Sequence, residues 1–272
     1  MKKILLLLLL LGVGFYIHQH FSEKRVLRIG VECDYVPNNW EEDQPSDSNF
    51  PIANHHGFYA EGYDLQIAKL VADELHAQVE VKKIAWNDLL PALNRGEIDA
   101  VFSGMLDTEE RRLNAAFSEV YDVTRTEYTI TVNEGSKYAE AKSLSDFSGA
   151  RLVAQKGTHL DAAIDQIEGV VHIPAVNTVA EMLEMVVDGK ADGTVINLDT
   201  GQAYMRLYSN LRVIRFPDGE GFKLNFSGIC AGVRKKDTAL LNEINAALVK
   251  ISQRDRRMLM DRTIARAIRS SH

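Results

Sequence analysis

Apolar and polar residues follow each other along the first half of the chain with the periods of strands and helices in turn. Short apolar runs at residues 26–31, 79–84 and 98–102 predict strands. Residues 63–75 place apolar side chains at helical spacing, and residues 87–94 predict a shorter helix. The order strand, helix, strand, helix, strand is typical of a parallel α/β sheet.

The ends of these strands are the first candidates for a site, because ligands of parallel sheets bind beyond the carboxyl ends of the strands. The residues there are Glu32, Tyr35, Trp86, Ser103 and Gly104. Residues 38–60 are polar and contain prolines, and we expect them to form a long loop.

The second half of the chain repeats the pattern and predicts a second α/β unit. Its expected elements are strands at 127–132, 150–155, 170–173 and 191–197, and helices at 160–167 and 178–187. An apolar strand and two helices follow, at residues 226–233, at 238–251 and from 255 onward.

This arrangement predicts two lobes in which the chain returns to the first. We expect residues 26–124 together with 229–272 to form one lobe and residues 125–228 to form the other. A cleft between two lobes is a natural place for a ligand.

One stretch of the first lobe, residues 99–121, has the outline of an anion site. A strand ends at Ser103 and Gly104, Thr108 is placed to cap a helix, and Arg111 lies in or near the first turn. Free N–H groups at a helix start and an arginine can together hold a carboxylate. The local sequence is equally compatible with a solvated arginine on an exposed helix.

The N-terminus predicts export from the cytoplasm. Lys2 and Lys3 precede an apolar run at residues 4–17, which is the pattern of an export signal, and residues 1–25 are interpreted as a signal peptide or an uncleaved anchor. We therefore expect an extracytoplasmic protein, secreted or held by that anchor. The net charge of −7 argues against nucleic acid as a partner.

The remaining chemistry-bearing residues have plain interpretations. An exported pair of cysteines can form a disulfide, but Cys33 and Cys230 are predicted to be free, buried thiols because the fold separates them. The adjacent His55 and His56 are interpreted as solvated loop residues and not as a metal site. The C-terminal basic run is interpreted as a solvated helix face; it comprises Arg254, Arg256, Arg257, Arg262 and Arg266.

Several motifs, in order and at matching spacing, resemble one known family. They are Gly-Tyr-Asp-Leu-Gln-Ile-Ala from Gly62, Ala-Trp-Asn-Asp-Leu-Leu-Pro-Ala-Leu-Asn-Arg-Gly-Glu-Ile-Asp-Ala from Ala85, Thr-Glu-Glu-Arg from Thr108 and Phe-Ser from Phe117. The sequence is similar over residues 26–264 to the extracytoplasmic solute-binding proteins of polar amino-acid ABC transporters, family 3. This resemblance implies a two-lobe type II periplasmic-binding-protein fold with two crossing strands as the hinge.

The resemblance also implies roles for the candidate residues. Arg111 would clamp the α-carboxylate of an amino acid, aided by backbone N–H groups near Leu106 and at Thr158. The carbonyl of Gly104 and the side chain of Asn197 would receive the α-ammonium group. No cofactor and no metal are implied.

The other candidates would surround the side chain of the ligand. Tyr35 and Trp86 would pack on it, although packing within the lobe is an alternative for Trp86. Glu32 would face the side chain, unless it is a solvated charge at the strand end. Gln155 would line the second lobe, and His159 follows the Gly-Thr turn.

Two positions depart from the family pattern. Leu106 stands where a serine or threonine is usual, and Asn197 stands where an aspartate or glutamate is usual. Each change removes a polar contact to an amino acid, at about 1 to 2 kcal/mol each. Asp199, predicted two residues further along the same strand, would face the same side and compensate.

The sequence thus predicts a receptor of an amino-acid ABC importer that is not an enzyme. Its expected partners are membrane permease subunits and a polar, basic amino acid, namely lysine, arginine, ornithine or histidine, with glutamine next. One alternative is a sensor or scaffold that has lost high-affinity uptake. Another is a periplasmic dehydratase of prephenate-like acids, for which Glu32 is the candidate acid or base.

Overall fold

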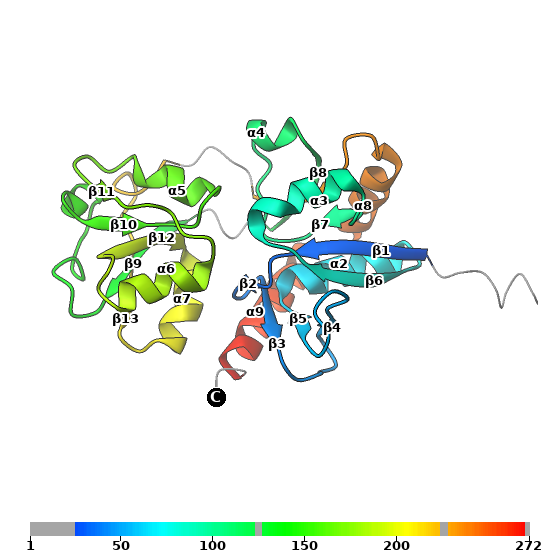
Figure 1. The fold of residues 1–272 in the computed structure, drawn as a ribbon, viewed down its shortest axis with the longest axis horizontal. Coiled ribbons are helices and arrows are strands. Elements are labelled where there is room, and N and C mark those ends of the chain that lie inside the picture. Colours follow the sequence, from blue (N-terminus) through cyan, green and yellow to red (C-terminus); the bar gives the residue numbers. More distant parts are fainter. Residues whose placement is uncertain (1–24, 123–126, 224–227, 270–272) are drawn as a thin grey trace, which may run out of the picture.

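The computed structural model describes residues 25–122, 127–223 and 228–269, and these form two lobes that lie side by side (Figure 1). The name first lobe is used here for residues 25–122 and 228–269, and second lobe for residues 127–223. The predicted lobe boundaries, after residues 124 and 228, lie in or next to residues 123–126 and 224–227, and the predicted export segment comprises residues 1–25. Residues 1–24, 123–126 and 224–227 lie outside the described part.

The first lobe contains a five-stranded mixed sheet, with strand order β6-β1-β7-β14-β8. Its strands are β1 (Arg25–Val31), β6 (Ala77–Lys83), β7 (Ala100–Val101), β8 (Ala116–Asp122) and β14 (Ile229–Val233). β1 pairs in parallel with β6 and β7, whereas β14 runs antiparallel to β7 and β8. The chain thus returns after the second lobe and adds β14 to this sheet.

The helices of the first lobe are α2 (Tyr63–Glu74), α3 (Leu89–Arg95), α4 (Glu109–Arg112), α8 (Thr238–Lys250) and α9 (Gln253–Arg269), with a 3₁₀ turn η1 (Trp86–Asp88) before α3. Of these, α2, α3 and α8 contact strands of the sheet, whereas the short α4 buries no residue. α2 buries Leu65, Ile67, Ala68 and Val71, which the helical spacing of the sequence predicts. The core of this lobe therefore lies between the sheet and these amphipathic faces.

The prediction of a loop at residues 38–60 is wrong in part. This segment supplies three strands of a small antiparallel sheet, in the order β2-β3-β5-β4. Its strands are β2 (Asp34–Tyr35), β3 (Asn39–Glu42), β4 (Phe50–Pro51) and β5 (Tyr59–Glu61). Such short strands lack a long alternating pattern, and side-chain pairing specifies them: buried Asn39 accepts from the Cys33 N–H at 2.8 Å and donates to Asp64 at 2.8 Å.

The second lobe contains another five-stranded sheet, with the order β11-β10-β12-β9-β13. Its strands are β9 (Tyr128–Asn133), β10 (Arg151–Val153), β11 (Val171–His172), β12 (Gly193–Asn197) and β13 (Leu211–Ile214). Its helices are α5 (His159–Ile164), α6 (Val179–Val187) and α7 (Leu198–Leu207), and a 3₁₀ turn η2 (Leu144–Phe147) precedes β10. β13 and α7 have no counterpart in the prediction.

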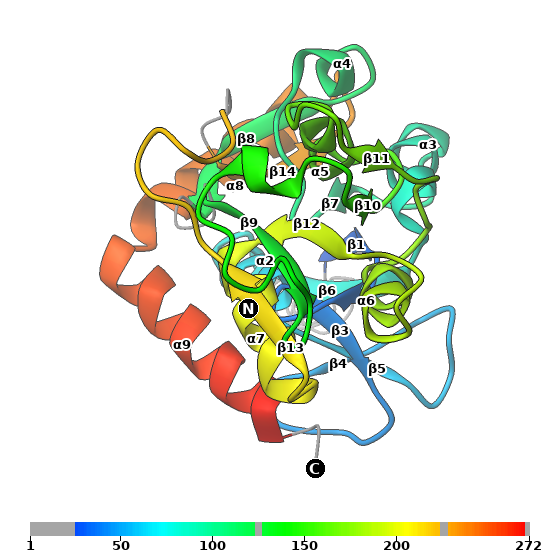
Figure 2. The same ribbon diagram turned by 90° about the vertical axis from the view of Figure 1, so that its left-hand side faces the viewer.

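The C-terminal helix of the first lobe runs past the second lobe. α9 contacts α7, and Figure 2 shows α9 along the outer edge beside α7. Within the residues that the structure describes, no helix combines the length and the apolar character that a membrane crossing requires.

Candidate functional site

Arg111 lies where the two lobes meet and is held by both. Thr108 caps α4 by accepting from the Arg111 N–H, as predicted, which fixes the start of the helix. The guanidinium donates to the Leu106 carbonyl at 3.0 Å in the first lobe and to the Gly157 carbonyl at 3.3 Å in the second. No carboxylate within the described ranges forms an ion pair with this guanidinium.

The Trp86 ring packs beside the Arg111 guanidinium. The Cζ atom of Arg111 lies 5.0 Å from the centroid of the Trp86 ring, a cation–π distance. The indole N–H donates to the Gly157 carbonyl at 3.1 Å. Burial lowers the pKa of Arg111 to about 10, so the guanidinium remains charged at neutral pH.

The turn before α5 completes this region, which we call the basic end of the predicted cleft: Trp86, Arg111, Gly157 and Thr158. Thr158 caps α5 by accepting from the Asp161 N–H at 3.4 Å. Next to it, the His159 ring stacks on Tyr128 with 5.2 Å between centroids. Burial, and secondarily the Arg111 charge, lower the pKa of His159 to about 3, so its imidazole is neutral.

Glu32 forms a second, buried contact between the lobes, at what we call the other end of the predicted cleft. It directly follows β1 and is 6% exposed. Its N–H donates to the Ser103 hydroxyl at 3.0 Å, and its carboxylate accepts from the Gln155 amide of the second lobe. Gln155 is in turn held by the Asn177 carbonyl at 3.0 Å. Burial raises the pKa of Glu32 to about 8, with a further contribution from the nearby carboxylate of Asp34.

Tyr35 and Asn197 make a further link across the cleft. The Asn197 amide donates to the Tyr35 hydroxyl, and the Tyr35 ring packs in the apolar cluster of the second lobe with Val153 and Val179. The Oδ1 atom of Asn197 is buried and has no hydrogen-bond partner among the described residues. We call the group Glu32, Asp34, Gln155 and Asn197 the acidic end of the cleft.

Position 104 requires a glycine because its backbone has a positive φ and because the Tyr35 ring lies close to it. Its φ is +63°, and a Cβ atom placed on it would lie 2.8 Å from Cε1 of Tyr35. Of the predicted residues, Trp86, Arg111, Glu32 and Tyr35 of the first lobe contact the second lobe directly, the last two through Gln155 and Asn197.

Some predictions on neighbouring residues need correction. Asp199 does not continue the strand: β12 ends at Asn197, and Asp199 lies in the first turn of α7 and lines a different cavity. Arg256 is not simply solvated, since its guanidinium donates to the carbonyls of Val120, Leu248 and Ile251. Cys33 and Cys230 are free and buried, as predicted.

The loop histidines also differ from simple solvated residues in one respect. His55 contacts the Glu41 carboxylate at 2.9 Å and stacks on Phe58. Across the described part of the chain, no group of three or more histidine, cysteine, aspartate or glutamate residues is arranged to hold a metal ion.

Sequence reasoning missed two residues beside the interface of the lobes, the buried Asn38 and the half-buried Asp34. Asn38 is 0% exposed, and both polar atoms of its side chain lack hydrogen-bond partners within the described residues. Asp34 faces the first turn of α6 in the second lobe. The capping pattern of Thr178 and Glu181 marks the start of α6 in the sequence, but no local pattern reveals which residue of the other lobe meets it.

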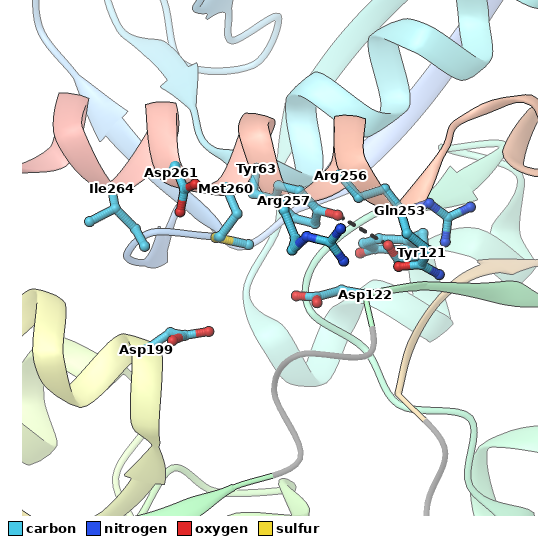
Figure 3. Close-up of a pocket in the computed structure, with 10 residues that line it drawn as sticks. All are labelled: Tyr63, Tyr121, Asp122, Asp199, Gln253, Arg256, Arg257, Met260, Asp261 and Ile264. Carbon is cyan, nitrogen blue, oxygen red and sulfur yellow. Dashed lines mark hydrogen bonds between the residues drawn. The ribbon is translucent and has the colours of Figure 1, made fainter.

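A separate cavity lies near α9 and α7 (Figure 3). It has a volume of about 210 Å³, and Asp199 faces the side chains of α9 across it. Tyr63 and Tyr121 line it and are joined by a hydrogen bond of 3.1 Å from the Tyr63 hydroxyl to the Tyr121 carbonyl. Of the residues predicted to contact the ligand, Asp199 lines this cavity, and the candidates named at the strand ends do not.

Comparisons with known proteins agree with this geometry. The model of the family described as bacterial extracellular solute-binding proteins, family 3, matches residues 27–259. The arginine-binding extracellular protein ArtP of Bacillus subtilis is 26% identical over 91% of this chain and 92% of its own length. The glutamine-binding protein GlnH of the same organism, an ABC transporter protein, is 27% identical over 74% of this chain and 71% of its own.

Solved structures show the same fold. An amino acid ABC transporter substrate-binding protein from Streptococcus pneumoniae, bound to L-arginine, superposes with a TM-score of 0.73. The match covers 93% of this chain and 98% of that chain at 16% sequence identity. At that identity the likeness concerns the fold, which is the two-lobe type II periplasmic-binding-protein fold.

Proposed function

This chain belongs to the bacterial extracellular solute-binding proteins, family 3, and on that premise we propose that it is the extracytoplasmic receptor of an amino-acid ABC importer. It captures a polar L-amino acid between its lobes and delivers it to membrane permease subunits. We place the α-carboxylate at the basic end of the cleft and the side chain at the acidic end.

The half-buried guanidinium of Arg111 is the observation that carries this proposal. It lies between the lobes on a tryptophan face, its described contacts are carbonyl oxygens and not a carboxylate, and its charge persists at neutral pH. A carboxylate is the partner that such a fork of N–H donors binds best. The start of α5 adds further backbone N–H groups, although the Thr158 N–H itself donates to the Gln155 carbonyl at 3.3 Å.

The acidic end supports a basic side chain on the ligand. Glu32 is buried at the lobe interface and is followed two residues later by Asp34. The relatives whose names specify arginine or glutamine are consistent with a long polar side chain at this end. We therefore propose lysine, arginine, ornithine or histidine as the ligand, and glutamine as the neutral alternative.

A second candidate is a sensor or scaffold that binds amino acids weakly. It is favoured by the direct pairs that Glu32 makes with Gln155 and Tyr35 makes with Asn197, because a ligand must displace or share these bonds. Leu106 and Asn197 also provide weaker or fewer polar contacts to an amino acid than the residues usual in the family at these positions. We propose no catalytic role for Glu32, whose carboxylate is engaged by Gln155.

Thermal unfolding tests the proposal. A ligand at one hundred times its dissociation constant adds about 2.7 kcal/mol to the free energy of unfolding, which raises the midpoint by roughly 5 to 10 °C for a chain of this size. We expect this shift with one or two basic L-amino acids from a full set, and no shift in Arg111→Ala. A protein that responds to none of them contradicts the receptor and favours the second candidate.

A further inference from the structure

Asp34 lies on the first lobe but meets the second. It belongs to β2, and its carboxylate faces the first turn of α6, where the Thr178 hydroxyl and the N–H groups of Ala180 and Val179 favour its charged form. Its Oδ2 atom is buried and makes no hydrogen bond to any described residue. Burial outweighs these favourable contacts and raises the pKa of Asp34.

Glu32 and Asp34 are both engaged by the second lobe. Glu32 contacts Gln155, and Asp34 contacts the start of α6. Moving the lobes apart removes these second-lobe groups from both carboxylates and returns the carboxylates toward water. Closing the lobes therefore desolvates two negative charges that lie two residues apart in the chain.

The charged groups around this pair leave it without a dedicated cation. Lys83 on β6 acts on Asp34, but its ammonium pairs with the Glu41 carboxylate at 2.8 Å. The Tyr204 hydroxyl of α7 is neutral, because burial raises its pKa far above neutrality. Arg111 holds carbonyls at the basic end, and the neutral His159 lies beside it. Within the described residues, no further cation is among the groups that act on Glu32 or Asp34.

A second observation points to a positively charged ligand group here. The buried Oδ1 atom of Asn197 is an acceptor that has no donor among the described residues, and its amide N–H₂ contacts Tyr35, the residue that follows Asp34. Three acceptor side chains, those of Glu32, Asp34 and Asn197, thus each lie at a contact between the lobes.

We propose that Asp34 is a second acidic, specificity-determining residue of the cleft, and that Glu32 and Asp34 together make closure of the lobes conditional on a positive charge. That charge comes from the side chain of a basic amino acid or, in its absence, from a bound proton. The part concerning amino acids rests on the function proposed above; the part concerning protons does not.

The sign of the pH effect follows from burial. A carboxyl that has a higher pKa in the closed form than in the open form binds more protons when the lobes are closed, so acid favours closure and rising pH favours opening. A basic ligand replaces the proton, which is then released to solvent. Each unit of pKa difference changes the ratio of closed to open molecules by tenfold.

Single-molecule energy transfer between the lobes tests this inference without any amino acid. Dyes are attached at Lys69→Cys on the first lobe and Glu168→Cys on the second, both exposed, while Cys33 and Cys230 are buried. We expect the closed-to-open ratio of the purified protein to fall at least tenfold between pH 5 and pH 9. Asp34→Asn and Glu32→Gln each flatten this slope, and Asp47→Asn, at an exposed loop position of the first lobe, leaves it unchanged.

Calorimetry with L-arginine in two buffers of different ionisation enthalpy then measures the released proton. We expect a release near pH 7 in the original protein and a smaller one in Glu32→Gln. A closed-to-open ratio that does not change with pH, or a slope that survives both substitutions, overturns the inference even if L-arginine binds. Failure of every amino acid to bind while the pH slope persists overturns the proposed function and leaves the proton-linked closure standing.

Discussion

The two ends of the cleft handle charge in opposite ways. At the basic end, Arg111 keeps its charge at neutral pH, because a ring face and two carbonyl oxygens compensate for its burial. At the acidic end, burial raises the pKa values of Glu32 and Asp34, and the groups that contact them are neutral amides and a hydroxyl. The basic end is a fixed charge, whereas the acidic end is a charge that depends on what binds.

This difference predicts that the two ends play different parts in recognition. A fixed cation attracts the group that every amino acid shares, its carboxylate. A carboxyl that changes its proton occupancy distinguishes ligands by the charge of their side chains. The predictions below test this division of roles.

The largest expected effect is at the basic end. Arg111→Ala removes two hydrogen bonds to a charged group, at about 1.5 to 3 kcal/mol each, and should weaken binding of any amino acid at least 100-fold in titration calorimetry. Arg112→Ala is the matched control, because Arg112 is exposed and pairs with Asp107 at 2.5 Å outside the cleft. Equal affinities in the two variants would show that Arg111 does not contribute to amino-acid binding.

The next effect separates ligands by charge. Glu32→Gln keeps the size of the side chain and removes its charge, so L-arginine should bind about 30-fold more weakly, since a hydrogen bond to a charged group contributes about 2 kcal/mol. L-Glutamine should change by less than about threefold, because a neutral side chain gains little from the lost charge. Glu80→Gln, at a half-buried position of β6 where the carboxylate pairs with Lys82 at 3.8 Å, is the control. Parallel losses for both ligands would contradict a role of Glu32 in reading charge.

A gain of affinity is expected from Asn197→Asp. It restores a charge-assisted bond to an α-ammonium group, and affinity for an L-amino acid should rise about tenfold, in line with the roughly twofold strength of such bonds over neutral ones. The corresponding α-hydroxy acid lacks the ammonium group and should gain nothing. An unchanged Kd for the amino acid, measured by calorimetry, would place the ammonium elsewhere.

The smallest effect is expected from Leu106→Ser. An added hydroxyl near the ligand carboxylate contributes about 1 kcal/mol, or about fivefold in affinity. The loss of a buried leucine lowers the melting temperature independently of binding. Leu113→Ser, at a 73% exposed position, should change neither quantity. If Leu106→Ser does not tighten binding in the folded protein, the carboxylate does not approach this residue.

Much of the fold could be predicted from the sequence because its signals are local. Residues that are neighbours in the sequence determine the apolar periods that predict α2 and the β strands. They also determine the caps at Thr108 and Thr178. The small sheet of β2 to β5 could not be predicted, since its strands are short and are held by the buried side chain of Asn39, whose partner Asp64 lies on α2.

The site shows the same limit. Arg111 and Glu32 could be proposed from motifs at the ends of strands, whereas Asp34 acquires its environment only when α6 of the other lobe meets it. Asp199 was misplaced because nothing local marks the end of β12 and the start of α7: Asn197 precedes the helix without a side-chain cap. Contacts between lobes depend on the whole fold, and a local pattern does not contain them.

The central claim is that Arg111 binds the carboxylate of an amino acid. A thermodynamic cycle measures it most directly, using the amino acid with the largest thermal shift, its decarboxylated amine, the original protein and Arg111→Ala, all by titration calorimetry. The account predicts that the free energy of binding weakens by nearly the same amount when the ligand carboxylate is removed and when the guanidinium is removed. Removing both groups should weaken it little more than removing either one. Additive losses would show that the two groups do not meet, and would contradict the claim.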